Sequence, residues 1–120
     1  MSGTGGAGGE AVAGRERRGK LVRDRIPEII RAAGGEPQVH VADGDEYLAR
    51  LEAKLHEEAD EVRAAASAPE ALEELADLLE VLRALAEAHG ADFSRVEEIR
   101  RRKAEERGGF AGRIVWTGNR

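Results

Sequence analysis

The sequence predicts an all-α fold, an antiparallel helical bundle that dimerisation completes. Only 3% of the 120 residues are aromatic, so the core must come from Leu, Ile, Val and Ala, which are residues of packed helices rather than of sheets. Apolar residues recur at helical spacing in two long stretches, over 45–66 and 70–88. A short loop joins these stretches, which makes the two helices antiparallel neighbours in a hairpin.

The first nineteen residues differ from the rest of the chain. They contain seven glycines and almost no bulky apolar residue, so they cannot bury enough surface to offset the entropy of ordering. We expect a disordered Gly-rich leader over 1–19 and a single domain over 20–117. About a hundred residues can form a domain alone, although oligomerisation would increase the buried surface noticeably.

This domain is expected to begin with an extended segment from Lys20 to Val22 and a short helix after it. Asp24 is the expected N-cap of that helix and Gly34 its expected end. Pro27 is tolerated because it falls in the first turn. The apolar residues that we expect to dock into the core are Ile26, Ile29 and Ile30.

Capping motifs predict where the later helices begin. Ser67 and Glu70 form a capping box that separates the two long helices. Ser94 and Glu97 form a second candidate box, which opens a last helix that ends at two consecutive glycines. Alternating side chains over 110–117 then predict a short β segment at the C-terminus.

The composition excludes several classes of protein and site. The chain has no cysteine, which excludes disulfides, thiolate metal ligands and a cysteine nucleophile. No apolar run approaches the roughly 20 residues of a membrane span, and the N-terminus lacks the apolar centre of a signal peptide. We therefore expect a soluble, cytoplasmic protein that has no membrane partner.

Charge is distributed unevenly along the chain. The net charge is −5, and residues 45–87 carry thirteen acids but only four bases. This region would repel phosphate unless metals intervened, so we do not expect a nucleic acid polymer as partner. The bases gather instead over 15–31 and 95–113. An acidic centre between basic flanks suits a metal-bridged anion better than a bare polyanion.

Four carboxylates lie inside or along the edge of the apolar faces of the two long helices. At 3.6 residues per turn, Glu58 lies about 50° and Glu61 about 110° from the centre of the first apolar stripe. On the second helix Glu74 falls inside the apolar arc and Asp77 at its border. Three other acids point away from this inner edge: Glu57, Asp60 and Glu73.

The apolar arc of the second long helix covers about half of its circumference. It consists of Leu72, Leu75, Leu78, Leu79, Val81, Leu82 and Leu85, whereas the first helix has a narrower stripe of Leu48, Leu51, Leu55, Ala59 and Val62. So broad an arc indicates contact with more than one neighbour. This favours a bundle completed by a second subunit, a homodimer at least.

Three interpretations of the four carboxylates remain open on periodicity alone. They are the ligands of a hard divalent cation such as Mg²⁺, which oxygen ligands suit. They are ordinary solvated flanks of highly charged helices. Or they belong to an internal network of ion pairs. An acid at an apolar edge normally costs stability, because its charged form loses water and gains no partner.

A basic stripe on the last helix could meet an anion. Arg100, Lys103 and Arg107 follow one another at helical spacing, while the other bases of this helix have acidic neighbours at i,i+4. Phosphate is the natural ligand of such a stripe. The alternatives are a solvated face or pairing with the acidic helices of the same fold.

Three segments in this order resemble one known family. The pattern Glu57-Glu58-x-x-Glu61, a spacer of twelve residues and Glu74-x-x-Asp77 is similar to the paired acidic motif of the MazG-like all-α nucleotide pyrophosphohydrolase superfamily. The segment from Lys20 to Ile30 and the pattern Lys103-x-x-x-Arg107-Gly108-Gly109-Phe110 resemble its phosphoribosyl-ATP pyrophosphohydrolase-like branch. The resemblance spans about residues 20–114.

The resemblance implies an enzyme that hydrolyses a nucleoside triphosphate between the α and β phosphates, giving a monophosphate and pyrophosphate, with Mg²⁺ as cofactor. The implied catalytic metal ligands are Glu58, Glu61, Glu74 and Asp77, and the implied substrate contacts are Lys103 and Arg107. For the segment from Lys20 to Ile30, contact of Arg23 or Arg25 with the substrate is the alternative to docking of its isoleucines into the core. Related members often carry Asn where this chain has Arg100. Clearing unwanted nucleotides is the role that the resemblance suggests.

Two alternatives to this function stay open. The histidine-pathway phosphoribosyl-ATP pyrophosphatase needs the same site chemistry, and no base-binding pocket can be recognised in the sequence to separate the two. The other alternative is a non-catalytic helical module that dimerises through its leucine face.

Overall fold

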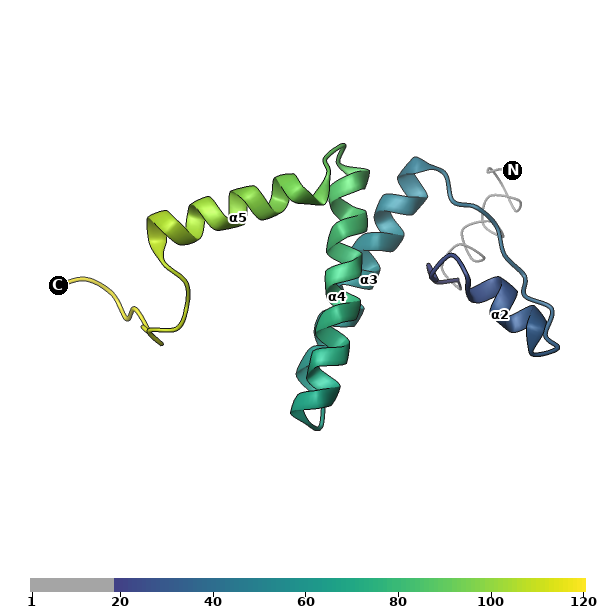
Figure 1. The fold of residues 1–120 in the computed structure, drawn as a ribbon, viewed down its shortest axis with the longest axis horizontal. Coiled ribbons are helices and arrows are strands. Elements are labelled where there is room, and N and C mark those ends of the chain that lie inside the picture. The colour runs from purple at the N-terminus through teal and green to yellow at the C-terminus, as the bar shows by residue number, and fades with distance from the viewer. Residues whose placement is uncertain (1–18) are drawn as a thin grey trace, which may run out of the picture.

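A computed structural model describes residues 19–120, so the predicted leader lies outside the described residues except for Gly19. The described chain is all-helical, as expected, with the elements α2 (Ile26–Ala32), α3 (Gly44–Ala64), α4 (Ala68–Ala88) and α5 (Phe93–Arg107). Helices α3 and α4 lie side by side as an antiparallel hairpin, while α5 and α2 extend from it on opposite sides (Figure 1).

The hairpin confirms the predicted cap at Ser67, while the cap of its first helix, Asp43, was not predicted. Asp43 begins α3 by accepting a hydrogen bond from the backbone N–H of Glu46 at 2.8 Å. Ser67 caps α4 and accepts from the backbone N–H of Glu70 at 3.3 Å. The Glu70 carboxylate in turn accepts from the N–H of Ala66 at 2.9 Å, so side chains satisfy backbone donors on both sides of the turn.

The core of the described chain is small. Its buried apolar residues are Leu51, Val81 and Ala86. The radius of gyration is 19.3 Å, whereas a compact domain of about 100 residues has a value of about 13 Å. A chain this open leaves apolar surface in water, above all the leucine face of α4, which we define as Leu72, Leu75, Leu79 and Leu82.

The prediction for α2 was wrong in two respects. Arg25, not Asp24, occupies the N-cap position. A cap at Asp24 would need the N–H of residue 26 or 27, but the N–H of Ile26 donates to the carbonyl of Arg23 at 3.0 Å and proline has none. The expected docking of α2 into the core is also absent: none of its residues is buried, and Ile29 and Ile30 are exposed. Polar contacts hold this segment instead.

The start of α5 also differs from the prediction. Asp92, not Ser94, occupies the N-cap position, and the Ser94 hydroxyl donates to the Asp92 carboxylate at 3.3 Å. A tertiary contact favours the earlier start, because the guanidinium of Arg83 on α4 lies 5.1 Å from the centre of the Phe93 ring, the first residue of the helix. Gly108, with φ +82°, ends α5 as expected.

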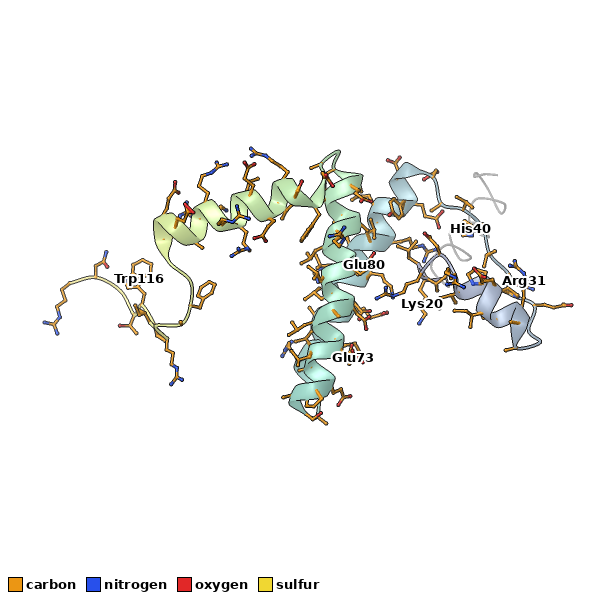
Figure 2. The ribbon with its side chains drawn as sticks, viewed as in Figure 1. Lys20, Arg31, His40, Glu73, Glu80 and Trp116 are labelled. Carbon is orange, nitrogen blue, oxygen red and sulfur yellow. The ribbon has the colours of Figure 1, made fainter. Side chains whose placement is uncertain are left out.

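The predicted β segment over 110–117 does not form, because no partner strand exists in the described residues. Its large side chains stay in water: Phe110 is 98% exposed and Trp116 78%. An alternating pattern cannot make a strand when no neighbour accepts its backbone hydrogen bonds. Figure 2 shows Trp116 beyond the end of α5, away from the hairpin.

Candidate metal and phosphate site

The hairpin brings three of the four predicted carboxylates together. Glu58 of α3 and Glu74 and Asp77 of α4 each offer an oxygen atom, and these atoms lie within 4.8 Å of one another. Packing of α3 on α4 positions them, because Glu58 lies on the face of α3 that turns toward α4. Three of the carboxylates that helical periodicity selected are therefore brought together by the packing of α3 on α4.

Glu58 is the most buried of these acids, with 8% of its surface exposed. Its nearest cation is Lys54, one turn earlier on α3, whose Nζ lies 3.6 Å from Glu58 Oε2 and 3.3 Å from Glu57 Oε1. The lysine is thus shared between a buried acid and an exposed one. A buried carboxylate with a single shared ammonium remains short of positive charge.

Glu61 stands apart from the cluster. It is exposed and its carboxylate is not among the three that converge. It is nevertheless near enough to act on Glu74. Partial burial is the largest cause of the raised pKa of Glu74, the negative charge of Glu61 is the second, and the charges of Asp77 and Glu58 follow. Repulsion among these acids therefore makes the metal-free cluster electrostatically costly.

The remaining acids of the two motifs point away, as predicted. Glu57, Asp60 and Glu73 are all exposed, and Figure 2 shows Glu73 on the outer surface of α4. Asp60 lies 3.8 Å from Arg63 on the same helix. These residues are solvated helix flanks.

Asp77 has a partner that the sequence does not predict. A guanidinium nitrogen of Arg23 donates to Asp77 Oδ1 at 2.8 Å, across 54 positions of sequence. Both side chains are about half exposed, at 58% and 44%. The only signal of this contact in the sequence was the basic character of the N-terminal flank. The pair ties the segment before α2 to the acidic cluster.

The three carboxylates fit a hard divalent cation. Two oxygen ligands of one Mg²⁺ lie about 2.9 to 4.2 Å apart, given metal–oxygen distances near 2.1 Å and octahedral geometry. The observed spread, at most 4.8 Å, extends slightly beyond this range, so the half-buried Glu74 and Asp77 would have to rotate toward a bound cation. Carboxylate oxygens and the lack of any cysteine exclude a thiolate site.

The basic residues of α5 do not reach this cluster within one chain. Helix α5 packs against α4 only and extends away from the hairpin (Figure 1). Arg100 also differs from the prediction that the stripe lacks acidic partners, since its guanidinium bonds both oxygens of Glu97, at 2.9 and 2.7 Å. Glu97 lies three positions before Arg100, so a comparison of i,i+4 neighbours does not include this pair. Within the described part of the chain, Lys103 and Arg107 form no ion pair.

The family comparison agrees with the acidic motif. Residues 36–104, more than half of the chain, match the family described as phosphoribosyl-ATP pyrophosphohydrolase. The match supports a nucleotide pyrophosphohydrolase-like activity. It includes every predicted site residue except Arg107 and begins after the segment from Lys20 to Ile30.

An uncharacterized protein of Mycolicibacterium smegmatis is 56% identical over 54 residues, which are 45% of this chain and 55% of the relative. The chain thus spans about half the length of that relative. No solved structure matches the chain. Over residues 19–120, none of the helices is both long and apolar enough to cross a membrane.

Proposed function

The chain belongs to the phosphoribosyl-ATP pyrophosphohydrolase family, and we propose that it is a Mg²⁺-dependent nucleoside triphosphate pyrophosphohydrolase. The reaction would split the bond between the α and β phosphates and release a monophosphate and pyrophosphate. The observation that carries the proposal is the convergence of Glu58, Glu74 and Asp77 with too few cations to neutralise them. We include Glu61 as the fourth ligand, because its charge already acts on Glu74.

The side chains have separate roles in this proposal. A bound divalent cation would supply Lewis acidity to the phosphates and to the attacking water. Glu58, the most buried of these carboxylates, accepts the proton of that water in this proposal. Glu61, Glu74 and Asp77 hold the substrate complex in line for attack, and cationic side chains stabilise the departing pyrophosphate.

A second copy of the chain would supply those cations. The leucine face of α4 is 40–66% exposed, and a contiguous apolar face of this kind marks an interface. A homodimer formed through it would bury these leucines and bring α5 of one subunit toward the hairpin of the other. Lys103 and Arg107, and secondarily Arg100, would then bind phosphate across the subunit boundary. A monomer at micromolar concentration in sedimentation experiments would contradict the dimer.

Pyrophosphate release tests the proposed reaction. Purified protein is incubated with a panel of nucleoside triphosphates, with and without Mg²⁺. We expect release that needs Mg²⁺ and falls at least about 100-fold in Glu58→Gln and Asp77→Asn, because each removes a direct metal ligand. The matched controls Glu57→Gln and Glu73→Gln, on the outer faces of the same helices, should retain activity. No release from any nucleotide, or full activity in the site variants, would exclude the enzyme.

Phosphoribosyl-ATP belongs in the same panel. The family description names this substrate, which favours the histidine-pathway pyrophosphatase as the second candidate. A clear preference for phosphoribosyl-ATP over every triphosphate would select it. If neither substrate class reacts and Mg²⁺ does not bind, a non-catalytic dimerisation module remains. Clearance of unwanted nucleotides is the physiological role that we propose for the triphosphate pyrophosphohydrolase.

A further inference from the structure

A cavity lies beside the carboxylate cluster, between the hairpin and the segment of residues 21–29. Its volume is about 710 Å³, within the range of about 300–1,000 Å³ that is usual for small-molecule sites. Glu58 and Asp77 line one end of it. The cavity exists because α2 does not pack closely on any other described helix, while Arg23 holds the preceding residues to Asp77.

The lining of this cavity includes both apolar and charged side chains. The hairpin contributes the ring of Tyr47 and the side chains of Leu51 and Ala84, and the 21–29 segment contributes Val22 and Ile26. These side chains offer an apolar surface with one aromatic ring, which suits the faces of a nucleobase. Charged residues of α4 also line the cavity, namely Glu80, Arg83 and Glu87.

Arg23 links this cavity to the carboxylate cluster. It lines the cavity and pairs with Asp77, a proposed metal ligand. A cation bound by Asp77 would compete with the guanidinium for the same carboxylate. Arg23 would then be left beside the phosphates without its partner, and a guanidinium forms strong paired hydrogen bonds with phosphate oxygens.

The other bases of the cavity are already engaged. Arg25 bonds Glu28 at 3.2 Å on its own segment, and Arg83 lies over the Phe93 ring. Lys54 is held by the two acids of α3 described above. A cation at the carboxylates would leave Lys54 its second partner, Glu57, whereas Arg23 would lose Asp77, its one ion-pair partner among the described residues.

We propose that this cavity binds the nucleoside end of the substrate and that Arg23 binds its α-phosphate, a role that rests on the proposed function. The pyrophosphate end then points out of the cavity, past the carboxylates. The 21–29 segment, which lies outside the matched family region, thereby becomes part of the active site.

A tyrosine of the cavity can report ligand binding directly. Tyr47 is the only tyrosine and it lines the cavity, so its ring signals in an NMR spectrum are unique. AMP, GMP, CMP and UMP are titrated separately in the presence of Mg²⁺, with pyrophosphate as the probe that lacks a nucleoside. We expect at least one monophosphate to shift the Tyr47 signals and pyrophosphate to leave them unchanged.

Variants then separate the role of Arg23 from a structural one. Arg23→Ala should weaken binding of the monophosphate about tenfold or more, because a charge-assisted phosphate contact is lost. Its affinity for Mn²⁺ alone should stay the same or rise, because a competitor for Asp77 is gone. Arg23→Lys, which keeps the charge, should have a smaller effect on the monophosphate. Arg31→Ala, near the end of α2 and away from the hairpin (Figure 2), is outside the cavity lining and should leave both affinities unchanged.

Filling the space beside the apolar side chains of the cavity gives an independent test. Ala84→Phe should abolish the Tyr47 response to monophosphate and leave binding of Mn²⁺ and pyrophosphate intact. If no monophosphate affects Tyr47 while the protein still releases pyrophosphate, the cavity is not the nucleoside site and the proposed function survives. If Arg23→Ala weakens Mn²⁺ and monophosphate equally, Arg23 only holds Asp77 and the inference fails. A Tyr47 response without any pyrophosphate release would support the nucleotide site and overturn the proposed reaction.

Discussion

Helix α5 and the α3–α4 hairpin are both rich in glutamate, yet Glu97 and Glu98 of α5 and Glu74 of the hairpin are in opposite electrostatic states. On α5, Glu97 bonds Arg100 and Glu98 bonds Arg95, and these contacts lower the pKa of both carboxyls. On the hairpin, burial and neighbouring acids raise the pKa of Glu74. Three acids converge there around one shared lysine and one arginine.

This difference separates two kinds of acidic pattern that look alike in sequence. Glutamates at i,i+3 from arginine form local ion pairs on one helix, and such exposed pairs contribute little to stability or function. Glutamates that meet acids from another helix need an external cation. The distinction depends on which face each acid occupies and on what packs against that face.

The largest expected effect tests whether the two regions meet across a dimer. Glu58→Gln and Lys103→Ala proteins should each be nearly inactive, because one lacks the proposed proton acceptor and the other a proposed phosphate contact. When the two are mixed and allowed to exchange subunits, half of the dimers are mixed, and each mixed dimer has one intact site if α5 acts across the interface. Activity should recover to about a quarter of the wild-type value.

Recovery of activity depends on the exchange of subunits between the two variants. Each variant protein incubated alone under the same conditions is therefore the control. Mixtures that stay inactive while native mass spectrometry detects mixed dimers would mean that α5 serves its own subunit or no site at all. Leu79→Glu in both proteins should prevent both the mixed dimers and the recovery.

The next effect is stabilisation by cations. Mg²⁺ at 100 times its dissociation constant should add about 2.7 kcal/mol to the free energy of unfolding, because it binds the folded state alone. Glu74→Gln should lose most of this gain, and Glu97→Gln should keep it, since Glu97 is paired within α5. Thermal unfolding followed by circular dichroism measures both. Equal gains in the two variants would show that Mg²⁺ binds elsewhere.

The smallest effect is the dependence of stability on pH in the metal-free protein. The raised pKa of Glu74 means that the folded state binds the proton more tightly, so its ionisation lowers stability as pH rises above the usual value of 4.5. Glu97 has a lowered pKa, so its contribution is present above 4.5 and is lost as pH falls below it.

The two variants should therefore deviate from wild type in opposite directions. Glu74→Gln should gain melting temperature relative to wild type between pH 4.5 and 7, while Glu97→Gln should be slightly less stable than wild type at pH 7 and equal to it at pH 3. Parallel curves for the two variants would contradict the contrast between the hairpin and α5.

The tertiary structure decided three features of the site that the sequence left open. Periodicity gives an angle about a helix axis but not the distance to another helix, so it selected Glu61 together with Glu58 although only Glu58 is buried against α4. The Arg23–Asp77 pair joins residues 54 positions apart, and no local pattern encodes such a contact. Helix α2 does not pack against the hairpin, and the cavity lies between them. The apolar pattern of α2 predicted the opposite, that its isoleucines dock into the core.

The sequence by itself determined the helical hairpin, its capped turn at Ser67 and the inward carboxylates Glu58, Glu74 and Asp77. These are local properties, because helical period, caps and proline positions act within a few residues. It also determined the leucine face of α4, which remains exposed in one chain. Only the tertiary structure decided which charges meet. The energy of two charges depends on the distance between them in space, and the sequence does not reveal that distance for residues as far apart as Arg23 and Asp77.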